Sequence, residues 1–279
     1  MSKLSFKTFV KKSFPSLFAK TYFYGFWKVV YNFCLKGMGI GNSITFYTSG
    51  EENAMKQIFN KYNIKTVFDV GANFGNYSAT IKEKFPDTVI YAFEPHPKTF
   101  NVLKNNTSKY ENLFIFNMAI GNPVNGQDQT IKLYDYANND GSEHASVLPD
   151  TFLYSYNTNN IISHEVELKS LRDFCRGNNI SEIDFLKIDT EGFEFDVLKG
   201  VQEMLDNNCI KFIQFEFNAM NAGRVFFLDF WKMLSKNFFL FRLFPDGLYK
   251  IEAYDPLFLE IFHFQNYIAI NKSVWIQTD

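Results

Sequence analysis

Four acidic residues stand at or near the ends of stretches that have the composition of buried strands. They are Asp69, Glu94, Asp189 and Glu216. In an open α/β sheet, ligands bind at the carboxyl ends of the strands, where such acids can accept hydrogen bonds from hydroxyls, take up a proton or hold a cation. One acid alone could equally cap a helix. Four of them, with a glycine loop among them, favour a shared binding site.

The glycine loop follows the first of these acids. Residues 66–70 are rich in β-branched and aromatic residues, and Gly71 and Gly75 bracket the turn that comes next. Glycine lets a ligand approach the backbone closely, and the start of the following helix offers free N–H groups. That helix is indicated by apolar residues with the spacing of one helical face, at Tyr77, Ile81 and Phe85. The stretch therefore predicts a strand, a ligand-binding turn and a helix.

Glu94 follows Gly75 by 19 residues. At this separation a carboxylate on the second strand can accept hydrogen bonds from the hydroxyls of a ribose. The spacing fits a nicotinamide cofactor as well as an adenosyl one. Residues 71–75, however, lack the G-x-G-x-x-G pattern that holds a pyrophosphate, and this absence disfavours the nicotinamide cofactor.

Strand-like and helix-like segments alternate along the chain, which predicts a mostly parallel sheet with right-handed crossovers, an α/β fold. The polar residues 123–165 form an insertion with an added strand at 131–136, at the position where substrate contacts are usually built. The last segments are predicted as antiparallel edge strands, at 238–244 and 267–270. The other predicted strands are 66–70, 89–93, 113–116, 183–188 and 210–217, and the predicted helices are 54–62, 98–105, 194–205 and 225–234.

The composition excludes several classes of protein. Of the 279 residues, 46% are apolar, so the chain can bury a core and is not disordered as a whole. A net charge of -2 argues against a general polyanion binder, so no nucleic-acid partner is expected. The three cysteines are widely spaced and suggest neither a disulfide framework nor a zinc site. Because no secretory signal is evident, we expect a cytoplasmic location in a reducing compartment.

Residues 1–48 form a basic and aromatic extension, which we separate from a domain at residues 49–279. Residues 1–50 contain seven lysines and no acidic residue, and since the whole chain carries -2, the remaining residues carry -9. A helical arrangement places four aromatic residues along one side, at Phe14, Phe18, Tyr22 and Phe26.

Two interpretations of this extension remain open. It either packs on the domain or on a second subunit, which leaves a homodimer open, or lies as an interfacial helix on an anionic membrane, at the inner face of the cell membrane. The apolar stretch at 21–35 is too short to span a bilayer. Three glycines at 37, 39 and 41 predict a linker.

Four ordered motifs resemble the FkbM-type methyltransferases. They are Asp-Val-Gly-Ala-Asn-Phe-Gly at 69–75, Phe-Glu-Pro at 93–95, Ala-Ile-Gly at 119–121, and Lys-Ile-Asp-Thr-Glu-Gly-Phe-Glu at 187–194 with Val-Leu-Lys-Gly at 197–200. The resemblance spans about residues 64–218 and leaves the extension uncovered. It implies a Rossmann-like class I methyltransferase fold that uses S-adenosylmethionine to methylate a hydroxyl, often on a sugar of a glycan, a glycolipid or a secondary metabolite.

The resemblance also implies roles for individual residues. Asp69, Gly71 and Asn73 would line the methionine end of the cofactor in the loop that Gly75 closes. Glu94 would bind the ribose, Asn117 to Ala119 would border the adenine, and Asp189 would lie beside the transferable methyl group. One departure from the family is Leu-Arg-Asp at 171–173, where the family has Leu-Asp.

Methyl transfer to a hydroxyl needs a base, because a hydroxyl is a poor nucleophile until its proton leaves. Asp189 is the first candidate, followed by His144 and Glu191, whereas His96 is expected to be a turn residue. Magnesium held by Asp189, Glu191 and Glu216 is an alternative that nothing in the spacing demands, so no metal requirement is expected.

The sequence thus predicts an S-adenosylmethionine-dependent O-methyltransferase with a small-molecule or glycan acceptor. One alternative is an NAD-dependent oxidoreductase, which the missing glycine pattern disfavours. The other is an inactive, membrane-peripheral binding protein, which the lysine-rich extension would support.

Overall fold

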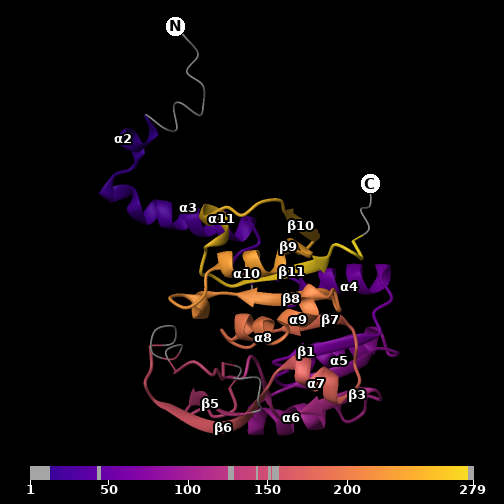
Figure 1. Cartoon of the computed structure of the whole chain (residues 1–279). Coiled ribbons are helices and arrows are strands. Elements are labelled where there is room, and N and C mark those ends of the chain that lie inside the picture. The colour runs from indigo at the N-terminus through magenta and orange to yellow at the C-terminus, as the bar shows by residue number, and fades with distance from the viewer. Residues whose placement is uncertain are drawn as a thin grey trace.

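The computed structural model describes residues 13–42, 45–124, 129–142, 144–149, 152 and 157–275. Its centre is an eight-stranded sheet in the order β10-β9-β11-β8-β7-β1-β2-β3 (Figure 1). Strands β3, β2, β1, β7 and β8 are parallel, and β11, β9 and β10 continue the sheet in antiparallel pairing. The bounds are β1 Thr66–Val70, β2 Val89–Phe93, β3 Leu113–Phe116, β7 Ile183–Ile188, β8 Ile210–Phe217, β9 Phe238–Phe244, β10 Gly247–Ile251 and β11 Gln265–Asn271. The predicted fold class is confirmed.

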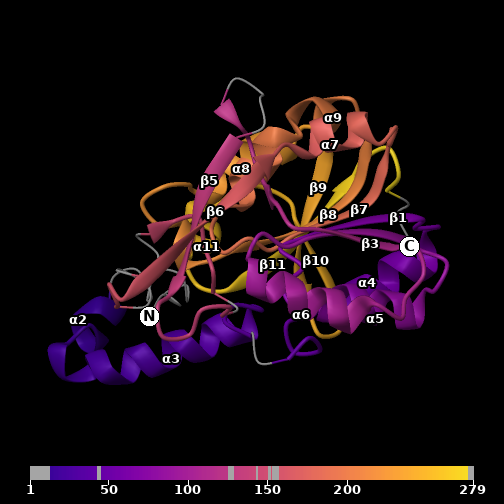
Figure 2. The ribbon, with the colours of Figure 1, turned by 90° about the horizontal axis from the view of Figure 1, so that it is seen from below.

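Helices cover both faces of this sheet, as Figure 2 shows. Helices α4, α5 and α6 pack on one face around Ile58, Ile81 and Leu103, and α7 to α10 pack on the other around Phe174, Leu198 and Phe230. This two-sided cover explains why the central strands are apolar along their whole length. The bounds are α4 Glu51–Lys61, α5 Asn76–Lys84, α6 Pro97–Thr107, α7 Leu171–Gly177, α8 Glu194–Gly200, α9 Gln202–Asp206, α10 Phe227–Leu234 and α11 Pro256–Leu259, with a 3-10 turn at Ala219–Asn221.

The predicted helix at 194–205 is divided into α8 and α9. The division follows Gly200, where a Cβ atom would lie 2.0 Å from the carbonyl oxygen of Gly121. Only glycine fits this close contact, and glycine also weakens a helix interior. The prediction of one continuous helix was therefore wrong because a packing contact with a distant loop was not visible in the sequence.

The insertion forms a second sheet of three strands in the order β4-β6-β5. Strand β5, Gln129–Tyr136, contains the predicted strand, whereas β6, Ile161–Lys169, lies partly in a region that we expected to be an irregular insertion. Strand β6 is polar on its exposed face and is held by its antiparallel pairing with β5. Strand β4, Ala119–Ile120, pairs with β6 and joins this small sheet to the end of the central one.

The N-terminal segment consists of short helices that project from the domain (Figures 1 and 2). They are α2 Phe14–Phe18, a 3-10 turn at Thr21–Phe23 and α3 Tyr24–Gly37. The predicted single helical side through Phe14 and Phe26 is wrong, because the chain is extended at Lys20. The indole of Trp27 donates a hydrogen bond of 2.9 Å to the Phe18 carbonyl, which folds α2 back on α3.

The predicted linker is instead a tight junction with the domain. Ile40 is fully buried, and the N–H of Gly41 donates to the Phe264 carbonyl oxygen at 2.8 Å. Within the described residues, no helix is long and apolar enough to cross a membrane.

We predict that Gly71→Ala lowers the free energy of unfolding by at least about 3 kcal/mol. Gly71 has a φ of +78°, and an added Cβ atom would lie 1.7 Å from the carbonyl oxygen of Asp189. Urea denaturation followed by circular dichroism measures the change. The matched control is Gly177→Ala at the end of α7, where an added Cβ atom meets nothing within 4 Å, so a change of less than about 1 kcal/mol is expected. Equal effects of the two substitutions would contradict the steric argument.

Candidate functional site

A cavity of about 930 Å³ opens at the carboxyl ends of the parallel strands. Its wall combines strand-end residues of β1, β2, β7 and β8 with residues of the insertion, including Ser142 and His144. Three of the four predicted strand-end acids line it: Glu94, Asp189 and Glu216. The sheet therefore brings together side chains that are far apart in sequence, as expected for an open α/β sheet.

Asp69, the fourth acid, is buried beneath the cavity and is not part of its lining. Its carboxylate accepts a hydrogen bond of 2.6 Å from the Ser78 hydroxyl and lies 3.4 Å from the ammonium group of Lys187. The aspartate thus ties β1 to α5 and β7. This geometry suits a residue that positions the loop and Lys187 rather than one that touches a ligand.

The glycine loop is anchored to the second strand. The N–H groups of Gly71 and Ala72 donate to the Phe93 carbonyl oxygen at 3.0 and 2.9 Å, and the N–H of Asn73 donates to the Glu94 carboxylate at 2.9 Å. At Gly75, φ is +84° and an added Cβ atom would lie 2.6 Å from Leu103, so glycine is required where the loop enters α5.

Glu94 is held with its carboxylate in the cavity wall. One oxygen accepts from Asn73, and the other accepts from the N–H of His96 at 2.8 Å. Burial raises the pKa of Glu94 to about 7, although both hydrogen bonds act in the opposite direction. Two carboxylate oxygens fixed in this way still have free lone pairs for a ligand hydroxyl.

Asn73 also lines the cavity and has an unusual backbone, with a φ of +50°. Its side-chain oxygen is buried and has no hydrogen-bond partner among the described residues. Asn117, predicted to border the adenine, lies outside the lining and donates 2.9 Å hydrogen bonds to the carbonyl oxygens of Glu94 and Pro95. Its neighbours Met118 and Ala119 do line the cavity.

Asp189 is the most exposed of the cavity acids, with 41% of its side chain accessible. Its carboxylate lies 3.2 Å from the ammonium group of Lys187. Burial alone would lower the pKa of Lys187, but the carboxylates of Asp189, Asp69 and Glu51 outweigh burial and raise it. Lys187 is therefore a fixed cation that lies against the Asp189 carboxylate.

Glu191 and His144 face each other across the cavity wall, with 3.8 Å between Oε1 of the glutamate and Nδ1 of the histidine. Burial raises the pKa of Glu191 to about 7, while the neighbouring His144 opposes the shift. A φ of +53° turns the Glu191 backbone, and the Ser146 hydroxyl donates to its carbonyl oxygen at 2.8 Å. Glu191 thus combines a raised pKa with an imidazole neighbour, a combination that is common at functional sites.

Glu216 lies at the end of β8 and is nearly buried. Burial, together with the charges of Asp189 and Glu191, raises its pKa well above the usual value. Asn218 donates a hydrogen bond to its carboxylate. Glu194 lies behind this group and accepts hydrogen bonds from the N–H groups of Thr190 and Gly192, which shapes the loop after β7.

Glu51 is a cavity residue that our sequence analysis missed. It stands at the start of α4, and its buried carboxylate accepts hydrogen bonds of 2.7 Å from Ser49 and from the Gln214 amide. Tyr77 donates to the same Gln214 at 2.9 Å. The only local signal was a Glu-Glu pair at a helix start, which is common in helices that bind nothing.

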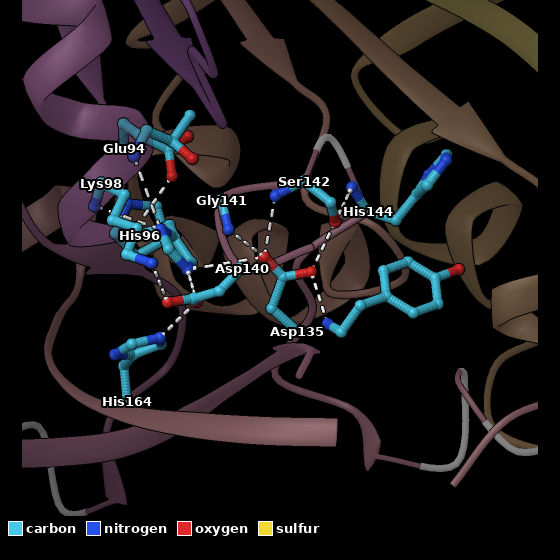
Figure 3. Close-up of polar contacts among 12 residues, drawn as sticks. Glu94, His96, Lys98, Asp135, Asp140, Gly141, Ser142, His144 and His164 are labelled. Atoms are coloured by element: carbon cyan, nitrogen blue, oxygen red, sulfur yellow. Dashed lines mark hydrogen bonds and ion pairs between the residues drawn. The ribbon is translucent and has the colours of Figure 1, made fainter. Parts of the chain in front are cut away.

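His96 joins the insertion to the second strand (Figure 3). It caps α6, and its Nδ1 accepts hydrogen bonds from the N–H groups of Lys98 and Thr99, so the ring proton lies on Nε2. That nitrogen lies 2.9 Å from Asp140, whose same oxygen is 2.7 Å from Nε2 of His164. The expected turn residue is therefore a buried brace between α6, β6 and the loop after β5.

The side chains of His96, Asp140 and His164 are of types that bind metal ions, and their possible ligand atoms lie within 4.8 Å of one another. A metal at this position would displace the proton from Nε2 of His96, whose Nδ1 already accepts hydrogen bonds. Neither nitrogen of the His96 ring would then carry a proton, so the imidazole would have to become an anion. In addition, the ammonium group of Lys98 lies 2.7 Å from Asp140. The arrangement suits a hydrogen-bonded brace better than a metal centre.

Comparison with protein families identifies the chain. Residues 69–242, more than half of its length, match the Methyltransferase FkbM domain. The chain belongs to the FkbM methyltransferase family. This confirms the resemblance that the four motifs predicted.

Three curated relatives are methyltransferases by name. Methyltransferase 1 of Beauveria bassiana is 29% identical over 159 residues and covers 52% of this chain and 63% of that protein. Methyltransferase sdnD of Sordaria araneosa is 31% identical over 165 residues, covering 49% and 60%. The 2-O-methyltransferase NoeI of Sinorhizobium fredii is 24% identical over 168 residues, covering 57% and 66%. The matches thus span between 60% and 66% of the length of these relatives.

Among solved structures, the plantazolicin methyltransferase BpumL in complex with SAH has a TM-score of 0.42 to this chain. It is 10% identical in sequence, and the match covers 92% of this chain and 93% of that one.

We predict that Glu216→Gln stabilises the protein at pH 8 but not at pH 4. The pKa of the Glu216 carboxyl group is raised in the folded state. The protonated group therefore favours folding below the pKa that it has in the unfolded chain, and this contribution is lost as the pH rises toward the folded-state pKa. Glutamine does not ionise, so the variant does not lose this contribution to stability at high pH. We expect a melting temperature several degrees higher at pH 8, and a difference of about 1 °C or less at pH 4, by differential scanning fluorimetry. The control is Glu165→Gln on the exposed face of β6, which should leave both values unchanged; a pH-independent effect of Glu216→Gln would contradict the assignment.

Proposed function

We propose that the chain is an S-adenosylmethionine-dependent O-methyltransferase whose acceptor is a sugar hydroxyl of a glycan, a glycolipid or a glycosylated metabolite. Membership of the FkbM family supports methyl transfer, and the charge of the cavity supports the choice of cofactor. Among the described residues of the lining, Lys187 is the only lysine or arginine. The acidic residues of the lining are Glu51, Glu94, Asp189, Glu191 and Glu216.

A cavity with this excess of acidic groups attracts a cation and disfavours a second anion. S-adenosylmethionine brings a sulfonium and an ammonium group, and supplies an electrophilic methyl group when bound. NAD would instead place a pyrophosphate among the carboxylates. The charge of the site therefore supports the adenosyl cofactor over the nicotinamide alternative, in agreement with the missing G-x-G-x-x-G pattern.

The residues present fit the proposed cofactor. The Glu94 carboxylate is held at the end of β2, the position from which an acid binds ribose hydroxyls. The unpartnered side-chain oxygen of Asn73 offers an acceptor to an ammonium group in the glycine loop. A volume of about 930 Å³ leaves room for a second molecule beside the cofactor.

Part of the cavity lining suits a hydroxylated acceptor. Aromatic rings of Phe193, Phe262 and Phe264 line it together with the polar groups of Asn218 and Glu216. Rings can cover the C–H faces of a sugar, while carboxylate and amide groups bind its hydroxyls. The name of the relative NoeI, a 2-O-methyltransferase, agrees with an oxygen acceptor.

Glu191 is the base that we propose, in place of Asp189. Asp189 is paired with Lys187 at 3.2 Å, so its carboxylate already has a cationic partner. Glu191 has a pKa of about 7, and His144 lies beside it to receive or share the proton. A carboxylate with this pKa can accept the hydroxyl proton near neutral pH without a metal ion, so turnover should survive EDTA.

We predict that the wild-type protein releases or absorbs heat on titration with S-adenosylhomocysteine in calorimetry, and does not on titration with NAD. Glu94→Gln should weaken the affinity by about 10- to 100-fold, because hydrogen bonds to a charged group contribute about 1.5 to 3 kcal/mol. Glu165→Gln serves as the control and should bind as the wild type does. Binding of NAD without binding of the adenosyl compound would refute the proposed cofactor.

We predict a pH-dependent rate that reports the base. With an acceptor found by methyl transfer from labelled cofactor to a panel of glycans and glycolipids, wild-type kcat/KM should rise with pH and level off above about 7, as Glu191 loses its proton. Glu191→Gln should lose at least about 100-fold in kcat, and the rise with pH, but keep its affinity for S-adenosylhomocysteine. If Asp189→Asn abolishes the pH dependence and Glu191→Gln retains it, Asp189 is the base instead.

A further inference from the structure

Helix α3 carries an apolar stripe that its own domain leaves uncovered. Phe26, Val29 and Phe33 follow the i, i+3, i+7 spacing of one helical face, and their exposed fractions are 57%, 68% and 78%. Of the residues of α3, only Leu35 is buried. An amphipathic helix normally turns such a stripe toward a core, so an exposed stripe indicates a partner.

The rest of the projecting segment adds to this surface. In both views α2 and α3 project away from the central sheet (Figures 1 and 2). Leu17 of α2 and Tyr22 in the 3-10 turn are exposed to 54% and 75%. The expectation that the extension packs on its own domain is therefore wrong for α3, whose attachment is limited to its C-terminal end.

The segment is also strongly basic. Lys36 lies on α3 beside the stripe, and Asn32 and Lys28 follow the i, i+4, i+8 spacing that leads from it around the helix, away from the stripe. The first 50 residues contain seven lysines and no acidic residue, so these cations have no carboxylate partner within the segment. A helix that carries an apolar stripe, lysines outside the stripe and many aromatic residues has the composition of one that lies in the headgroup region of a bilayer.

We propose that the surface formed by Phe26, Val29 and Phe33 with Lys28 and Lys36, here called the α3 surface, docks this protein on an anionic lipid bilayer. A second copy of the chain is a weaker candidate, because a stable protein interface needs about 20 to 30 residues on each side, and one exposed stripe offers far fewer. A bilayer needs only the apolar stripe and the lysines outside it.

Docking would also place the cavity near the bilayer. Four residues after the end of α3, the N–H of Gly41 donates to the carbonyl oxygen of Phe264, which lines the cavity, and Arg242 donates to the carbonyl oxygen of Met38. The anchored end of α3 is thus fixed to the cavity rim. On the proposed function, on which this consequence rests, the favoured acceptor is a hydroxyl carried by a membrane lipid.

Vesicle flotation of the full chain tests the proposal. Vesicles of phosphatidylcholine with about 30% phosphatidylglycerol are compared with pure phosphatidylcholine, at low and high salt. We expect the wild type to float with the anionic vesicles, with binding that weakens as salt screens the lysines. The double variant Phe26→Gln/Phe33→Gln should partition at least about tenfold less, because its stripe has lost its apolar side chains.

The matched control is Val102→Gln/Phe114→Gln, which removes two exposed apolar side chains from α6 and β3 and should float as the wild type does. Equal flotation of the stripe variant and the wild type, or no flotation of the wild type, would overturn the proposal. So would a dimer in sedimentation velocity that the stripe variant dissociates, without any binding to vesicles, since a second copy would then be the partner.

Calorimetry with S-adenosylhomocysteine on the same proteins separates this proposal from the proposed function. If the protein binds S-adenosylhomocysteine but does not float, membrane docking is refuted and the proposed function is not. Flotation by a protein that binds no adenosyl compound would leave docking in place and refute the proposed function.

Discussion

The structure depends on one buried cation at the edge of its central sheet. Lys187 lines the cavity, and its ammonium group lies between Asp69, which ties β1 to α5, and Asp189, which also lines the site. Without this ammonium group, two carboxylates would face each other in a region of low dielectric constant, at a large electrostatic cost. The same charge acts on Glu51 from the first helix of the domain. Helix α4 and strands β1 and β7 are therefore held in register partly by one shared positive charge.

The charge of one lysine does not neutralise all the acidic residues of the cavity, and several of these residues have raised pKa values. Burial raises the pKa of both Glu94 and Glu191 to about 7, and burial together with the neighbouring carboxylates raises the pKa of Glu216 well above its usual value. The site therefore holds protons that a cationic ligand would displace, since a nearby positive charge favours the ionised form of a carboxyl group. Binding of a cation and release of protons are linked for this reason, and the proposed base becomes ready as the cavity fills.

Much of this arrangement could be predicted from the sequence, because the local composition marks the central strands. β-branched and aromatic runs predicted strands β1, β2, β3, β7, β8 and β9 with their observed bounds, and the acids at the strand ends predicted the location of the site. What remained hidden depends on contacts between distant segments. The Glu51 carboxylate is held in the cavity wall by Gln214 of the distant strand β8, and β6 pairs with β5 despite its polar face. The break between α2 and α3 depends on the indole of Trp27, which no helical periodicity reveals.

The insertion and the second strand are coupled through a histidine whose two nitrogens have separate tasks. Nδ1 of His96 caps α6, and Nε2 meets Asp140 in the loop after β5, while the backbone N–H of the same residue fixes Glu94. Burial lowers the pKa of His96, which keeps its ring neutral and preserves this division of donor and acceptor. A movement of the insertion would therefore pull on the residue that orients Glu94. Because Ser142 and His144 of the same loop line the cavity, the histidine beside the proposed base and the acid proposed for the ribose are positioned by one hydrogen-bonded unit.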